Sequence, residues 1–114
     1  MKTTAIRYEL GRVDGIPPGE GRTFVLGGRR IAVFHGRDGA LHATQADCPH
    51  RGGPLADGLV GGGVLICPLH ERRFDLATGL SQDGDCQIAV FAVTRRADGS
   101  VTVELPIPRI EAPV

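Results

Sequence analysis

The chain has 114 residues, of which 41% are hydrophobic, and its 13 acidic residues balance 13 Lys and Arg. This length predicts one domain, residues 1–114, and the neutral balance argues against a nucleic-acid or anionic-membrane partner. The sequence has no run of about 18 apolar residues, which is the length needed to cross a membrane. Residues 1–21 contain no apolar signal-peptide core, so we expect a cytoplasmic location.

Short apolar runs separated by turn residues predict a small antiparallel β protein. In the last run, Val101, Val103 and Leu105 alternate with Thr102 and Glu104, which is typical of a half-buried strand. In chain order, we expect strands at residues 4–9, 23–26, 30–35, 41–45, 64–66, 73–76, 88–95 and 101–105, with residues 51–63 forming a loop or the arm of a second hairpin.

Two short cysteine–histidine pairs are the most informative motif. Cys48 and His50 form the first pair, Cys67 and His70 form the second, and sixteen residues separate His50 from Cys67. Each pair follows a short predicted strand and starts a loop, so two loops at one end of a sheet stack could meet. Sulfur and imidazole are ligands for zinc, copper or an iron–sulfur centre.

A structural zinc site is the first alternative, because two Cys and two His satisfy a tetrahedral ion. Zinc fingers usually place both cysteines in one pair and both histidines in the other, whereas each pair is mixed in this chain. The odd cysteine count does not predict a disulfide framework. We interpret His35 and His42 as ordinary strand residues, and Cys86 as a small buried residue.

The segments around the pairs resemble the Rieske ferredoxin family. The resemblance rests on CPHRGGPL at residues 48–55, CPLH at residues 67–70 and FDLATG at residues 74–79. It implies an all-β fold, a small antiparallel β-sandwich with an inserted cluster-binding subdomain at about residues 46–79. It also implies one [2Fe–2S] cluster, with two cysteines on one iron and two histidines on the other. The implied ligands are Cys48, Cys67, His50 and His70.

The neighbours of these ligands predict a low reduction potential. High-potential members of the family carry a disulfide between the ligand loops and two hydroxyl donors at the cluster. The corresponding positions are Gly53 and Leu69 for the disulfide, and Arg72 and Phe74 for the hydroxyls. Because these donors are lost, the reduced cluster is less stabilised. We expect a potential near the lower end of the Rieske range, about −150 mV.

The resemblance implies a one-electron carrier that is not itself an enzyme. His35 and His42 are too few and too poorly placed for a second, mononuclear iron centre. We expect the chain to pass electrons from a reductase to a terminal oxygenase. The alternatives are the small Rieske subunit of an NADH-dependent nitrite reductase and a zinc-stabilised structural module.

Three arginines near the pairs allow two interpretations. The residues are Arg51, Arg72 and Arg73. They are either solvated surface charge or a docking patch for an acidic redox partner, which would make association depend on salt.

Overall fold

The structure is a computed structural model that describes residues 5–49, 54–68, 72–82, 84 and 86–106. These residues form β1 (Ala5–Arg12), β2 (Glu20–Leu26), β3 (Arg29–His35), β4 (Leu41–Gln45), β5 (Leu59–Gly61), β6 (Val64–Ile66), β7 (Arg73–Asp75), β8 (Val90–Arg95) and β9 (Ser100–Pro106), with 3₁₀ helices η1 (Val13–Gly15) and η2 (Leu55–Asp57). All strand pairs are antiparallel, which confirms the expected all-β fold. No helix among the described residues is long and apolar enough to span a membrane.

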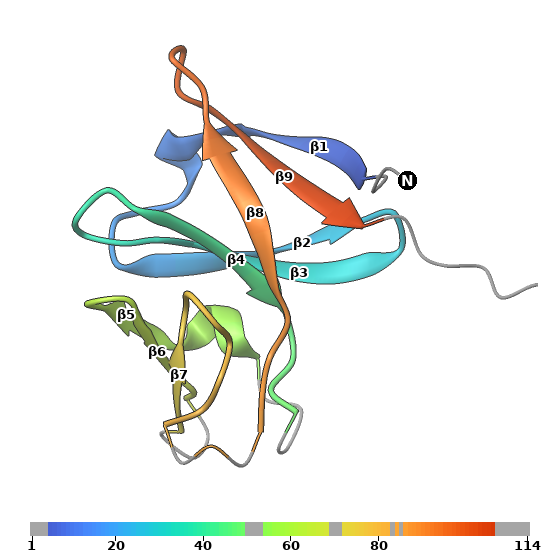
Figure 1. Cartoon of the computed structure of the whole chain (residues 1–114). Coiled ribbons are helices and arrows are strands. Elements are labelled where there is room, and N and C mark those ends of the chain that lie inside the picture. The colour runs from blue at the N-terminus through green and yellow to red at the C-terminus, as the bar shows by residue number, and fades with distance from the viewer. Residues whose placement is uncertain (1–4, 50–53, 69–71, 83, 85, 107–114) are drawn as a thin grey trace, which may run out of the picture.

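Six strands form one sheet in the order β1-β9-β8-β4-β3-β2. Figure 1 shows this sheet folding over on itself, so that β1, β9 and β8 lie across β2, β3 and β4. Side chains of the two halves meet in one core, which includes Ile31, Val33, Ala43, Val103 and Leu105. The expected small β-sandwich is therefore confirmed.

The strands β5, β6 and β7 form a second, three-stranded sheet in that order. Gly62 and Gly63 join β5 to β6 with φ angles of 59° and 77°, a conformation that glycine adopts readily at a two-residue turn. Residues 51–63 were expected to form either a loop or the arm of a second hairpin. The hairpin alternative is correct for β5, which pairs with β6. Figure 1 places this small sheet below the sandwich, next to η2.

Strand β3 contributes to two cores. Ile31 and Val33 belong to the sandwich core, whereas Ala32 and Phe34 belong to a second hydrophobic cluster shared with the small sheet. Successive side chains of a strand point to opposite faces, so a strand that is covered on both faces needs an unbroken apolar run. This requirement explains the sequence IAVF at residues 31–34, all of which are buried.

Several details of the predicted strands were wrong. β1 continues to Arg12 and β2 begins at Glu20, so both are longer than expected. The strand expected over residues 88–95 begins at Val90, because Ile88 donates its backbone N–H to Gly79 instead of continuing the ladder. Thr102 was expected on a polar face but is only 4% exposed. Its strand lies inside the sheet, with Glu9 and Thr94 as cross-strand neighbours on either side.

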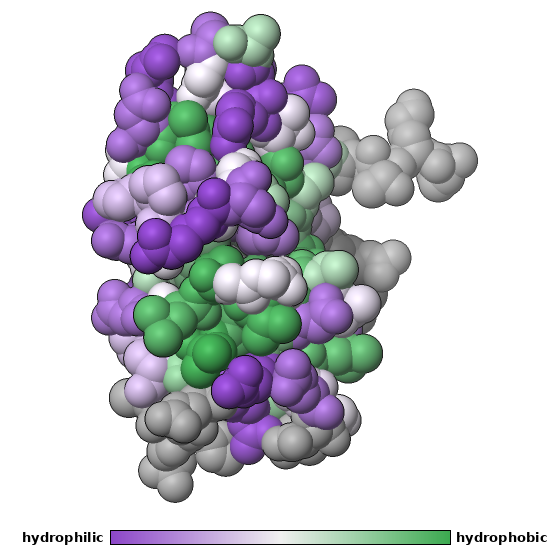
Figure 2. Space-filling view, turned by 90° about the vertical axis from the view of Figure 1, so that its left-hand side faces the viewer, coloured by the Kyte–Doolittle hydropathy of each residue, from purple (hydrophilic) through white to green (hydrophobic). Residues whose placement is uncertain are grey.

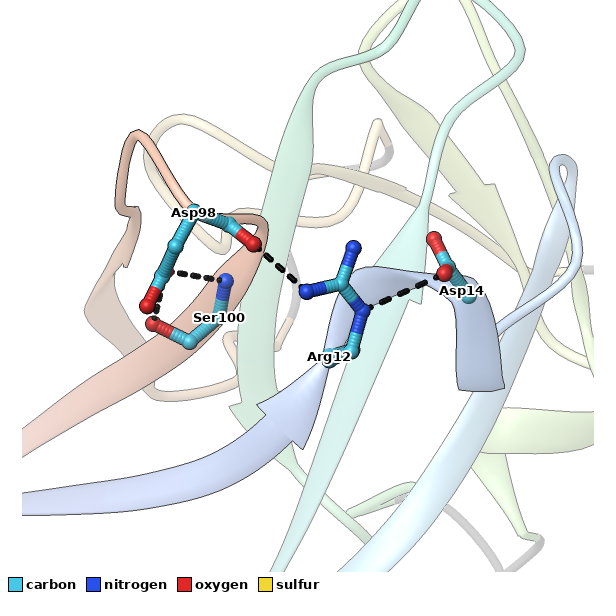
Figure 3. A network of polar contacts seen from close by, with 4 residues as sticks. All are labelled: Arg12, Asp14, Asp98 and Ser100. Carbon is cyan, nitrogen blue, oxygen red and sulfur yellow. Dashed lines mark hydrogen bonds and ion pairs between the residues drawn. The ribbon is translucent and has the colours of Figure 1, made fainter.

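The hairpin expected around Asp98 and Gly99 joins β8 to β9 and is drawn in Figure 3. The Asp98 carboxylate accepts hydrogen bonds from Ser100 Oγ at 2.7 Å and from Ser100 N at 2.9 Å. These bonds lower the pKa of the Asp98 carboxyl. Arg12 donates to the Asp98 carbonyl at 2.6 Å and to the Asp14 carboxylate at 3.3 Å, so the end of β1 is tied to this hairpin.

Candidate metal centre

Two of the predicted ligands, Cys48 and Cys67, lie in the same hydrophobic cluster. Their exposed fractions are 2% and 0%, and neither forms a disulfide. Cys48 lies beyond the end of β4, a strand of the sandwich, whereas Cys67 directly follows β6 of the small sheet. The second cluster therefore brings together two thiols that different sheets supply.

Each of these cysteines stands at the start of a loop whose ends are joined by backbone contacts. In the first loop, Leu55 N donates to Ala46 O at 2.9 Å, and Asp47 pairs with Pro54. In the second loop, Cys67 N itself donates to Arg72 O at 2.8 Å. Such closure holds the first residue of each loop in place.

The two predicted histidine ligands, His50 and His70, fall outside the described residues, in the segments between these loop ends. Among the residues that the structure does describe, no three or more His, Cys, Asp or Glu side chains gather as a metal site. Of the four predicted ligands, the two cysteines lie among the described residues. Two buried thiols from two closed loops fit a soft metal centre, and they suit one iron of a cluster with mixed ligands.

The other two histidines lie within strands, as expected. His35 Nδ1 is 2.7 Å from the Ile16 carbonyl oxygen, so this ring connects β3 to the chain after η1. His42 is half-buried, and burial lowers the pKa of its imidazole, with Asp38 acting in the opposite direction. Neither histidine belongs to the cluster that contains the cysteines.

Cys86 was expected to be buried, but the structure leaves it half-exposed at the edge of the same cluster. Its backbone is fastened to Ser81: Ser81 N donates to Cys86 O at 3.0 Å, and Cys86 N donates to Ser81 Oγ at 3.4 Å. These contacts hold the chain close to the small sheet and give the thiol a packing role.

The arginines near the loops differ from one another. Arg73 is exposed on β7, as either interpretation requires. Arg72 is half-buried and its Nε is inaccessible to solvent, so its guanidinium is only partly solvated. Arg51 lies outside the described residues. Of the two described arginines, Arg73 is the more accessible to a partner.

The outer face of the small sheet carries apolar side chains. Leu59 is 69% exposed, and Val64 and Ile66 on the same face are half-buried. Figure 2 shows hydrophobic side chains gathered on the side of the molecule to which this sheet belongs. A hollow of about 460 Å³ lies next to Cys67, and its lining includes Leu59, Ile66 and Pro68.

A sequence profile of the family described as the Rieske [2Fe–2S] domain matches residues 6–100. The chain belongs to the Rieske family. The match includes both cysteine–histidine pairs and every described strand of the small sheet. Both buried cysteines lie within the matched residues.

Known relatives of this Rieske chain fall into more than one redox system. The Ralstonia sp ferredoxin component of the naphthalene 1,2-dioxygenase/salicylate 5-hydroxylase systems is 36% identical over 67 residues, which cover 59% of this chain and 64% of the relative. The nitrite reductase [NAD(P)H] of Emericella nidulans is 36% identical over 105 residues, which cover 82% of this chain and 9% of that protein. The chain spans 9–64% of the length of the first three curated relatives that it matches.

Among solved structures, a Mycobacterium tuberculosis protein described as an NADH-dependent nitrite reductase small subunit has a TM-score of 0.85. The sequences are 24% identical, and the similarity covers 92% of this chain and 99% of that chain. At this identity the likeness establishes the fold alone. The Rieske sandwich with its added three-stranded sheet is therefore shared over nearly the whole chain.

The sequence motifs did not reveal the residues that hold the first loop in place. Arg30 donates through Nη1 to both carboxylate oxygens of Asp47, at 2.8 and 3.0 Å. Gln45 donates through Nε2 to the Asp47 carbonyl at 2.7 Å. Asp47 immediately precedes Cys48, so both contacts act one residue from the first thiol. The sequence carried no signal for either contact, because Arg30 and Gln45 look like ordinary strand residues.

Proposed function

We propose that this chain is a one-electron carrier that holds one Rieske [2Fe–2S] cluster. The proposed ligands are Cys48 and Cys67 on one iron and His50 and His70 on the other. The burial of both cysteines in one cluster, at the starts of two closed loops, is the observation that carries this proposal. When bound, such a cluster accepts and releases one electron.

We propose further that residues 46–79 are the cluster-binding subdomain of a single domain, residues 1–114. The chain itself has the task of holding the cluster, excluding water from the cysteine side and presenting the histidine side to a partner. It supplies no catalytic residues in this proposal. None of the three cysteines, all of which lie in the described part of the chain, forms a disulfide, which suits the reducing cytoplasm as the proposed location.

The first partner system that we propose is a reductase as electron donor and an oxygenase as acceptor. The Ralstonia ferredoxin component supports it. The second candidate is the small subunit of a nitrite reductase, and the longer alignment to the Emericella nidulans enzyme, over 82% of this chain, favours it. The two candidates require the same cluster and differ in whether the chain works free or bound to a large subunit.

An experiment on the source cell extract separates the two candidates. The tagged holoprotein is added to the extract and fractionated by size under anaerobic conditions, with NADH-dependent nitrite reduction assayed in each fraction. A free carrier elutes as the small protein, away from that activity. If the tagged protein elutes together with the nitrite-reducing activity, the nitrite reductase subunit replaces the free carrier as the proposed function. A colourless protein that contains zinc would overturn both.

A redox titration tests the predicted low potential. Phe74 is fully buried in the cluster that contains both cysteines, and it has no hydroxyl to donate. We expect a midpoint potential of about −150 mV, and a higher value for Phe74→Tyr, since a hydroxyl donor favours the reduced cluster. Phe24→Tyr, at a partly buried residue that packs against the sandwich core, is the control and should leave the potential unchanged. A wild-type value well above zero would contradict the prediction.

A further inference from the structure

The side chain of Gln45 joins two segments that are distant in sequence. Its Nε2 donates to the Asp47 carbonyl at 2.7 Å, and its Oε1 accepts from Ala89 N at 2.8 Å. The backbone of Gln45 takes part as well, because its N donates to Ala89 O at 3.0 Å. Both ends of the amide are thus satisfied by backbone groups, one from the first cysteine loop and one from residues 86–89.

Residues 86–89, which we name the connecting segment, also touch the side of the molecule that supplies the second cysteine. Ile88 N donates to Gly79 O at 2.8 Å, and Ser81 N donates to Cys86 O at 3.0 Å. Ile88 is 1% exposed and packs in the hydrophobic cluster with Cys48 and Cys67. The connecting segment therefore lies between β4 and the turn that follows β7.

This arrangement matters because the two thiols come from different sheets. Cys48 takes its position from β4 and Cys67 from β6, so their separation depends on how firmly the sandwich and the small sheet are joined. Packing in the shared cluster is not directional, whereas hydrogen bonds fix both distance and orientation. Gln45 makes two such bonds, one to the backbone that leads to Cys48 and one to the connecting segment, whose Ile88 is in turn bonded to the turn after β7.

Asp47 is held from a second direction by Arg30, at 2.8 and 3.0 Å. That ion pair is exposed, and exposed pairs contribute little to stability. The bond from Gln45 Nε2 to the Asp47 carbonyl is part-buried, so water competes with it less than with the exposed ion pair, whereas the bond from Ala89 N to Gln45 Oε1 is exposed. Of the two contacts to Asp47, the one from Gln45 is thus the stronger constraint on the backbone that leads to Cys48.

We propose that Gln45 is a positioning residue for the cluster: it sets the place of Cys48 relative to Cys67 by linking Asp47 to the connecting segment. The inference rests on the proposed function, because it needs a cluster between the two loops. Gln45 does not touch the metal in this proposal. It acts through the backbone on either side, as residues around metal ligands commonly do.

Gln45→Leu keeps the approximate size of the side chain and removes both hydrogen bonds. We expect the holoprotein of this variant to lose iron to a chelator about 10-fold faster than wild type. We also expect altered g values in the EPR spectrum of the reduced protein, because the geometry of the thiolate side changes. Arg95→Met is the control: it removes a side-chain donation to a backbone carbonyl, from Nη2 to Gly39 O at 2.6 Å, that lies outside both cysteine loops and the connecting segment.

Gln45→Glu is the second variant, for use if Gln45→Leu fails to fold by circular dichroism. Its carboxylate can still accept from Ala89 N, but it faces the Asp47 carbonyl with an oxygen and no proton to donate. We expect faster iron loss from this variant too. Iron loss and g values in either folded Gln45 variant that equal those of Arg95→Met would overturn the inference. A wild-type protein without an iron–sulfur EPR signal would overturn the proposed function instead.

Discussion

Cys67→Ala is expected to yield a folded protein without a [2Fe–2S] cluster. Cys67 is 0% exposed and begins the loop that Arg72 closes, so no other described thiol can take its place without moving the loop. In an oxidised [2Fe–2S] cluster the two sulfides and the two thiolates would together offset the charge of two ferric ions, so alanine would leave one positive charge unbalanced. Iron and sulfide analysis, visible absorption and EPR of the reduced protein measure the loss, which we expect to be nearly complete.

Cys86→Ala is the matched control for this prediction. Cys86 packs against the same cluster, yet it is half-exposed and its backbone is held by Ser81. We expect this variant to keep the full iron content and an unchanged EPR spectrum. Equal iron loss in the two variants would contradict the ligand assignment and make Cys86 a third candidate. Zinc bound with the stoichiometry of one ion per chain would favour the structural zinc site.

The ligand loops were predictable because their information is local. A cysteine and a histidine within three residues of each other, each time after a short predicted strand, indicate a metal centre and where it would lie in the chain. The hairpins at Gly62 and at Asp98 were predictable for the same reason, since turn geometry restricts residue type at particular positions. The all-β class followed from the same short-range pattern.

What the sequence did not reveal are contacts between distant segments. Ala89 lies far along the chain from Gln45, and no pattern in either segment marks them as partners. The burial of Arg72 and Thr102 was missed because it depends on which strands lie beside them. β8 begins at Val90 and not at residue 88 as predicted, because Ile88 is hydrogen-bonded to Gly79 in the turn after β7.

That turn gives the second prediction with a large effect, for Gly79→Ala. Gly79 has a φ of +83°, which costs any residue with a Cβ about 1–2 kcal/mol. An added Cβ would also clash with the carbonyl oxygen of Ile88. That oxygen is backbone and cannot rotate away as a side chain would. Because Ile88 N is itself bonded to Gly79 O at 2.8 Å, relief of the clash requires the connecting segment to shift.

We expect Gly79→Ala to lower the free energy of unfolding by about 3 kcal/mol or more, which combines backbone strain with steric overlap. Urea denaturation of the anaerobic holoprotein, followed by circular dichroism, measures this loss. A shift of the connecting segment should also reach the cluster, so iron loss to a chelator should accelerate together with the loss of stability.

Gly39→Ala separates the two causes. Gly39 has a φ of +89°, and a Cβ at this position meets no atom within 4 Å. Gly39→Ala therefore introduces the same backbone strain as Gly79→Ala without the steric overlap. We expect it to lower the free energy of unfolding by about 1–2 kcal/mol and to leave iron retention unchanged. Equal losses of unfolding free energy in the two variants would mean that the Ile88 carbonyl moves aside without destabilising the fold. The connecting segment would then be too loosely held to fix the distance between the two cysteine loops, and Gln45 could not position Cys48 through it.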